Sequence, residues 1–248
     1  MPDHPSFPTY HFPFKLSTEI LISFIKQEER KITDDAKKAI QCISPPIKII
    51  DKENIPSRGP VIITFNHYSR EGCFIAWAAL GIAACLEEDQ IWLMTSAWTK
   101  RTRGIDQLRT ALTKYIFKRL ANMYGFVTTP PLPLIAEELP ERAESVRKLI
   151  RILRENPEKI FCIAPEGQDF ENGALGFPPQ GTGKLIHQIQ GKEGCIVPVG
   201  IWEENGSLIL KFGKSYVIEE FNDKQDIDRF VSKTVMGKIS EQTPARLH

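Results

Sequence analysis

The chain alternates between short apolar runs and longer segments in which apolar residues recur at helical spacing. A continuous run rich in apolar and β-branched residues, such as 61–65, is typical of a strand buried on both faces of a sheet. A segment such as 138–155, which ends at Asn156-Pro157, is typical of an amphipathic helix. Because strands alternate with helices, the pattern predicts an α/β fold with a mostly parallel central sheet flanked by helices on both faces. The predicted strands are 61–65, 91–95, 125–129, 159–164, 195–202 and its hairpin partner 207–212, and the predicted helices are 73–86, 105–124, 138–155, 181–190 and 226–239.

The N-terminal part of the chain has a different pattern. Residues 1–13 contain four prolines, and because proline lacks an N–H and breaks helices, we expect an extended arm. Residues 14–44 predict two helical pieces, an apolar one followed by a charged one. Two interpretations stay open: a helical hairpin packed on the domain, or an interfacial membrane helix at 14–25. The expected organisation is an N-terminal arm and helical segment over 1–46 and an α/β domain over 47–248.

Composition narrows the class of protein. The 248 residues carry a net charge of +1, so no overall field selects a polyanionic partner. The five cysteines include no C-x-x-C pair, so buried or partly buried free thiols in a reducing compartment are expected, rather than disulfides or a zinc site. No signal-peptide pattern opens the chain, and the longest apolar stretch, 73–86, is shorter than the roughly 18 residues of a membrane span. We expect a cytoplasmic protein, at most peripheral on the inner membrane face.

Two polar groups follow predicted strands at the edge where α/β proteins bind ligands. Asn66-His67 comes directly after the strand 61–65, and Pro165-Glu166-Gly167 follows the strand 159–164. Ligands of open α/β sheets bind outside the carboxyl ends of the strands, and histidine titrates near neutral pH. Taken alone, each group could be an ordinary loop histidine or strand-end turn. His67 and Glu166 are 99 residues apart, so only the sheet could bring them together.

Several familiar sites are absent from the sequence. The stretch 177–184 resembles a phosphate loop, but Pro178 stands where the first glycine is required, and Leu185 follows Lys184 in place of serine or threonine. There is no G-x-S-x-G nucleophile elbow and no H-E-x-x-H zinc motif, and the five histidines do not cluster. We therefore predict neither a nucleotide-binding loop nor a metal site.

The strand-end groups, taken in order with two later motifs, resemble a known family. The later motifs are Gly176-Phe177 through Gly181-Thr182 and the strand Ile196-Val197-Pro198-Val199. Over about residues 47 to 218, the chain resembles the glycerolipid acyltransferases, that is, the glycerol-3-phosphate and lysophosphatidic acid acyltransferases of phospholipid biosynthesis. The resemblance implies transfer of a fatty acyl group from a thioester donor, acyl-CoA or acyl carrier protein, to a hydroxyl acceptor, with no metal or prosthetic group. It implies His67 as general base and substrate contacts from Asn66, Pro165, Glu166, Gly167, Gln168 and Gly181.

The sequence departs from the family pattern at two places. In the family, an aspartate five positions after the histidine orients the imidazole, and here that position is Gly72. Glu71 is the nearest carboxylate and is the expected replacement. The family also follows Pro-Glu-Gly with a small residue and a phosphate-binding arginine, where this chain has Gln168 and Asp169. An acceptor other than glycerol 3-phosphate or its lyso derivative is therefore expected.

A basic segment and two competing functions complete the expectations. Residues 100–119 carry seven lysines and arginines against one aspartate. Three interpretations stay open: a solvated helix face, a site that binds an anionic membrane surface, or a site that binds the phosphates of coenzyme A or acyl carrier protein. Nucleic acid is not an expected partner, because no recognition motif accompanies the charge. The alternatives to an acyltransferase are a catalytically impaired protein of the same fold that binds a lipid, an acyl chain or a partner, and a hydrolase that uses water as the acceptor.

Overall fold

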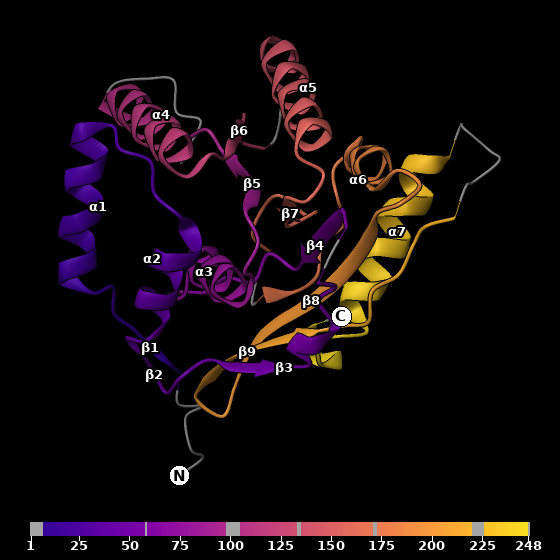
Figure 1. The fold of residues 1–248 in the computed structure, drawn as a ribbon, viewed down its shortest axis with the longest axis horizontal. Helices are drawn as coiled ribbons and strands as arrows, with labels where there is room; N and C mark the ends of the chain where they lie inside the picture. Colours follow the sequence, from indigo (N-terminus) through magenta and orange to yellow (C-terminus); the bar gives the residue numbers. More distant parts are fainter. Residues whose placement is uncertain are drawn as a thin grey trace.

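The structure is a computed structural model that describes residues 7–57, 59–97, 105–132, 135–170, 173–219 and 226–247. Its centre is a seven-stranded sheet with helices on both faces (Figure 1). The predicted fold class is therefore confirmed. Most of the predicted elements are present with ends shifted by a few residues, because turns and caps, rather than periodicity, set where an element stops.

The order of the strands decides which loops meet. The sheet runs β3-β9-β8-β4-β7-β5-β6. The strands are β3 Lys48–Ile50, β4 Val61–Phe65, β5 Gln90–Thr95, β6 Val127–Thr129, β7 Ile160–Ile163, β8 Cys195–Glu204 and β9 Ser207–Phe212. Strands β8, β4, β7, β5 and β6 are mutually parallel, while β9 pairs antiparallel with β8 as a hairpin, and β3 runs parallel to β9. Because β4 lies between β7 and β8, the loops after β4 and β7 leave the same edge of the sheet side by side.

Side-chain alternation along β4 explains why helices cover both faces. Val61, Ile63 and Phe65 belong to the core on the α3 side, whereas Ile62 belongs to the core beneath α5, α6 and α7. The two helical layers are visible on either side of the sheet in Figure 1. The helices are α1 Phe14–Lys26, α2 Ile32–Ile40, α3 Ile75–Cys85, α4 Ile105–Tyr124, α5 Leu139–Glu155, α6 Thr182–Gln190 and α7 Ile227–Ser240, with short 3₁₀ turns at Lys52–Asn54, Ala136–Glu138 and Ala245–Leu247.

The chain up to Ile50 contains both predicted helices and two features that the pattern did not predict. Strand β1, Thr9–Tyr10, pairs antiparallel with β2, Ile43–Ser44, and β3 adds an edge strand to the main sheet. These strands are two or three residues long, too short for an alternation to be recognised. The extended-arm prediction holds for the described part of the arm, apart from this minimal pairing, and residues 1–6 lie outside the described residues.

Helix α1 packs on the domain and also leaves apolar side chains exposed. It contacts α2 and α4, and the guanidinium of Arg119 on α4 donates to the carbonyls of Phe24 and Ile25 near its C-terminus. The hairpin interpretation therefore describes the packing. The exposed apolar residues of α1 are Phe14, Leu21, Ile22 and Ile25. Among the described residues, no helix has the length and apolar character needed to cross a bilayer.

The cysteines are free, as expected, but not all are shielded from solvent. Cys73, Cys85 and Cys162 are buried and Cys195 is partly buried, whereas Cys42 is exposed. The expectation of buried or partly buried thiols is thus wrong for Cys42, which lies in the turn between α2 and β2.

Candidate active site

The end of β4 is fixed to β8 by the side chain of Asn66. The amide of Asn66 is buried, donates from Nδ2 to the carbonyl of Ile201 at 2.9 Å and accepts from the Ile201 N–H at 2.7 Å. This pair continues the β4–β8 ladder by one residue after the backbone has turned away. These two hydrogen bonds fix the backbone just before His67. The amide of Asn66 is therefore bound within the protein rather than open to a substrate.

A buried carboxylate joins the loops after β4 and β7. Glu166 is 1% exposed. Its Oε2 accepts the backbone N–H of His67 at 2.5 Å, and its Oε1 accepts the backbone N–H of Gly176 at 2.6 Å. The structure thus brings His67 and Glu166 together at neighbouring strand ends. Burial raises the pKa of Glu166, and the two N–H donors oppose that rise.

Replacing Glu166 with glutamine is expected to destabilise the protein in a pH-dependent way. Glutamine offers one acceptor oxygen for two N–H groups, so one buried donor loses its partner at a cost of about 1–3 kcal/mol. Because the folded pKa of Glu166 lies above its ordinary value, its stabilising contribution is full at acidic pH and is lost as pH rises through the folded pKa. The difference in free energy of unfolding between wild type and Glu166→Gln should therefore shrink as the pH of urea titrations is raised above the ordinary carboxyl range. A difference that grows with pH would contradict this account.

The imidazole of His67 lies against Asp169. Nδ1 of His67 is 2.8 Å from Oδ1 of Asp169, with the side chains 18% and 64% exposed. Nδ1 does not meet the angle required of a well-aligned hydrogen bond, so the two groups are in close polar contact. The proximity of His67, aided by Ser69, lowers the pKa of Asp169 despite its partial burial. With Nδ1 facing a carboxylate, Nε2 is the ring nitrogen left to accept a proton.

The geometry does not favour the predicted partner, Glu71. Arg70 and Cys73 exchange backbone hydrogen bonds and close a tight turn around Glu71 and Gly72 before α3 begins. In the described ranges, no hydrogen bond or ion pair joins Glu71 to His67, and the Glu71 side chain is exposed. The prediction assumed that a helix begins immediately after His67. The chain instead forms a turn before α3, and Glu71 in this turn is exposed to solvent.

Gly72 explains why the family's aspartate cannot simply be restored in this turn. Its φ is +83°, in the left-handed region, where a residue with a side chain is strained. A Cβ at this position would also lie 3.2 Å from the guanidinium of Arg70. The sequence does contain a signal for Asp169, namely a carboxylate where the family has an arginine, but sequence spacing does not place it beside His67.

A second buried carboxylate, missed by the sequence analysis, anchors the same loop. Glu203 accepts two hydrogen bonds from Arg70, with Nη2 to Oε1 at 2.7 Å and Nε to Oε2. The hydroxyls of Tyr10 and Tyr68 donate to it at 2.6 and 3.0 Å. Burial is the main cause that raises the pKa values of both tyrosines, and the nearby Glu203 adds to the rise. The group ties the N-terminal arm and the His67 loop to the end of β8.

The remaining predicted substrate contacts take different places. Gly167 adopts φ +65°, which allows the turn after Pro165, and the neighbouring Gln168 is exposed. Gly181 caps α6, and its N–H donates at 2.8 Å to Asp228 of α7, which also accepts the N–H of Lys184 at 3.0 Å. The N-terminus of α6 is therefore occupied by a carboxylate of the chain.

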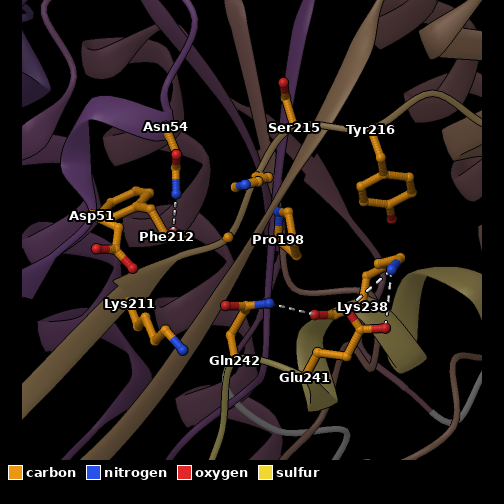
Figure 2. Close-up of a pocket in the computed structure, with 12 residues that line it drawn as sticks. Asp51, Asn54, Pro198, Lys211, Phe212, Ser215, Tyr216, Lys238, Glu241 and Gln242 are labelled. Atoms are coloured by element: carbon orange, nitrogen blue, oxygen red, sulfur yellow. Dashed lines mark hydrogen bonds and ion pairs between the residues drawn. The ribbon is translucent and has the colours of Figure 1, made fainter.

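A cavity elsewhere in the molecule is separate from this group. It measures about 480 Å³ and lies between β9, the following loop and the end of α7, as Figure 2 shows. Its lining includes Lys211, Tyr216 and the ion pair of Lys238 with Glu241. His67, Glu166 and Asp169, called here the His67 group, do not line this cavity. It therefore provides no chamber for an acyl chain beside His67.

Part of the predicted basic segment is engaged within the fold. Lys114 pairs with Glu141 at 3.3 Å, and Arg119 binds carbonyls of α1. Lys100, Arg101 and Arg103 lie outside the described residues.

Comparisons with known proteins agree with this architecture. A model of the family described as Acyltransferase matches residues 46–202, which include His67, Glu166 and Asp169. The fold is similar to the crystal structure of PlsC, the 1-acyl-sn-glycerophosphate (LPA) acyltransferase from Thermotoga maritima. That likeness has a TM-score of 0.55 at 15% identity and covers 85% of this chain and 77% of the other. No curated protein matches the chain. Since the family model spans more than half of the chain, and the matched region carries the His67 group at the strand ends, the protein belongs to the Acyltransferase family.

Proposed function

We propose that this protein transfers a fatty acyl group from a thioester donor to a hydroxyl acceptor, with His67 as general base. The observation that carries the proposal is the 2.8 Å contact between His67 Nδ1 and Asp169, on a loop fixed by buried Glu166. A histidine held by a carboxylate on one nitrogen has the other free to take a proton, which is the arrangement used for activating hydroxyl nucleophiles.

The proposed reaction balances without a covalent enzyme intermediate. Nε2 of His67 takes the proton of the acceptor hydroxyl as its oxygen attacks the thioester carbonyl. The tetrahedral intermediate collapses, the carbon–sulfur bond breaks, and the imidazolium returns its proton to the leaving thiolate. An ester and a free thiol result. Asp169 acts as a positioning residue that keeps the ring in one orientation and stabilises the imidazolium while it exists.

We further propose acyl-CoA or acyl carrier protein as the donor and a lipid as the acceptor, with peripheral contact on the inner membrane face. Support for membrane contact comes from exposed apolar side chains on two helices that touch each other, α1 and α4 (Figure 1). On α4 these are Leu108, Leu112 and Tyr115, in addition to the exposed residues of α1. Exposed apolar side chains on adjacent helices are of the kind that interfacial helices insert into the headgroup region.

The double change Leu21→Asp and Ile25→Asp on α1 is expected to weaken binding to vesicles with anionic lipid at least about tenfold. Removing two exposed apolar side chains from the bilayer interface and adding charge costs more than the 1.4 kcal/mol that corresponds to that factor. Vesicle sedimentation would measure it. Val217→Asp, which changes an equally exposed apolar residue outside α1 and α4, is the control and should bind as wild type does. Equal loss in both proteins would contradict the assignment.

The assay for the proposed activity is thiol release from palmitoyl-CoA, with a total lipid extract as acceptor. Release that requires the extract, together with a new acylated lipid, supports transfer. Release without the extract would indicate a hydrolase. Binding of palmitoyl-CoA with no release, from this donor or from palmitoyl acyl carrier protein, would favour a non-catalytic protein that binds acyl chains.

A further inference from the structure

The loops after β4 and β7, together with the N-terminus of the following helix α6, contain three groups that could bind a phosphate, and each already holds a carboxylate of the chain. The backbone N–H groups of His67 and Gly176 donate to Glu166. The N-terminus of α6, a common phosphate site in other proteins, donates to Asp228 through Gly181 and Lys184. The guanidinium of Arg70 is paired with Glu203. Each of these donors would have to leave a carboxylate partner before it could hold a phosphate.

Among the described residues of the loops after β4 and β7, the charge that remains exposed beside the imidazole is negative. The loop segments 66–73, 164–170 and 173–181 contain one permanently cationic residue, Arg70, and its charge is neutralised by Glu203. Asp169 is 64% exposed, and the groups that lower its pKa are His67 and Ser69, with no lysine or arginine among them. An acceptor whose hydroxyl reaches Nε2 therefore approaches this carboxylate.

Distance makes the effect on an acceptor phosphate appreciable. A phosphate two or three bonds from the reacting carbon would lie about 6–10 Å from the Asp169 carboxylate. At that range, a dianion and a carboxylate repel each other enough, after screening by salt, to lower affinity about tenfold.

We infer that the acceptor is a hydroxyl compound with no phosphate near the reacting hydroxyl, and that Asp169 excludes phosphorylated acceptors while it positions His67. This inference rests on the proposed acyl transfer. The substrate class is a neutral lipid or alcohol, such as a monoacylglycerol, rather than a lyso-phosphatidate.

The test compares kcat/KM for 1-oleoylglycerol and 1-oleoylglycerol 3-phosphate, which differ only in the phosphate. Both are presented at low mole fraction in nonionic micelles, and the neutral arm receives an equal fraction of an anionic phospholipid without a free hydroxyl, so that surface charge is matched. Wild type should prefer the neutral acceptor at least about tenfold, and the preference should fall at high salt. Equal use of both acceptors, or a preference for the phosphate, would overturn the inference while leaving acyl transfer intact.

Asp169→Asn tests whether the charge of Asp169 causes the preference for the neutral acceptor. It removes the charge but keeps the size, so both rates should fall through loss of His67 positioning, while the ratio of the two kcat/KM values should move about tenfold toward the phosphate. Glu193→Gln, in the turn before β8 at the opposite end of the strands, should leave the ratio unchanged. If turnover by the variant is too slow to measure, hexadecyl phosphate is used as a competitor of neutral-acceptor binding. It should compete more strongly in Asp169→Asn than in wild type. An unchanged preference in Asp169→Asn would refute the role of Asp169, and no transfer to either acceptor by wild type would refute the acyl transfer itself.

Discussion

His67→Ala is expected to lower acyl transfer by about 10³-fold or more, since a positioned general base contributes roughly 10²–10⁴-fold. The side chain is partly exposed and contacts the largely exposed Asp169, so the variant should fold. Thiol release from palmitoyl-CoA with a lipid acceptor measures the rate. A wild-type rate in His67→Ala would rule out the proposed base.

Asp169→Asn and Glu71→Gln separate the two candidate partners of His67. In a protease triad, loss of the orienting aspartate costs about 10⁴ in kcat. Asp169 is largely exposed and its contact is bent, so a smaller loss of about 10²-fold is expected here, in kcat rather than in KM for the donor. Glu71→Gln should stay within about twofold of wild type, because its side chain faces solvent from a turn. A larger loss of kcat in Glu71→Gln than in Asp169→Asn would show that Glu71, rather than Asp169, positions His67.

Glu203→Ala is expected to give the largest loss of stability, about 3–5 kcal/mol. Glu203 is 8% exposed and binds Arg70, Tyr10 and Tyr68, so its removal leaves a cation and two hydroxyls without their buried acceptor. For a chain of this size, such a loss corresponds to a fall in Tm of about 10 °C. Urea unfolding near pH 7 is the measurement.

The adjacent Glu204 provides the matched control. It forms a salt bridge with Arg246 at 3.0 Å, but both side chains are about half exposed. Glu204→Ala should therefore cost less than about 1 kcal/mol. The double change Arg70→Met and Glu203→Leu should recover part of the stability, because a buried pair replaced by apolar side chains of similar size is often neutral. Equal costs for Glu203→Ala and Glu204→Ala would show that the buried network is not important.

The fold could be read from the sequence because its elements are long and strongly patterned. The run 61–65 is apolar at every position but Thr64, which only a strand buried on both faces requires, and the segment 138–155 repeats at helical spacing. Parallel pairing then places His67 and Glu166 at neighbouring strand ends, although 99 residues separate them. The two-residue strands of the N-terminal segment could not be read, since they are held by pairing across the chain rather than by a local pattern.

The sequence alone determined the mostly parallel sheet and the positions of His67 and Pro165-Glu166-Gly167 at strand ends, because these depend on local periodicity. The strand order that makes β4 and β7 neighbours came from the tertiary structure. Only the tertiary structure decided which carboxylate faces His67. Glu71 is four residues away in sequence but is turned outward by the left-handed Gly72, whereas Asp169 is far away in sequence and within 2.8 Å in space. The partners of Glu203 were likewise decided by the fold, because Tyr10, Arg70 and β8 meet only once the sheet has formed. A short-range electrostatic contact depends on side-chain direction and distance, which sequence spacing does not specify across loops.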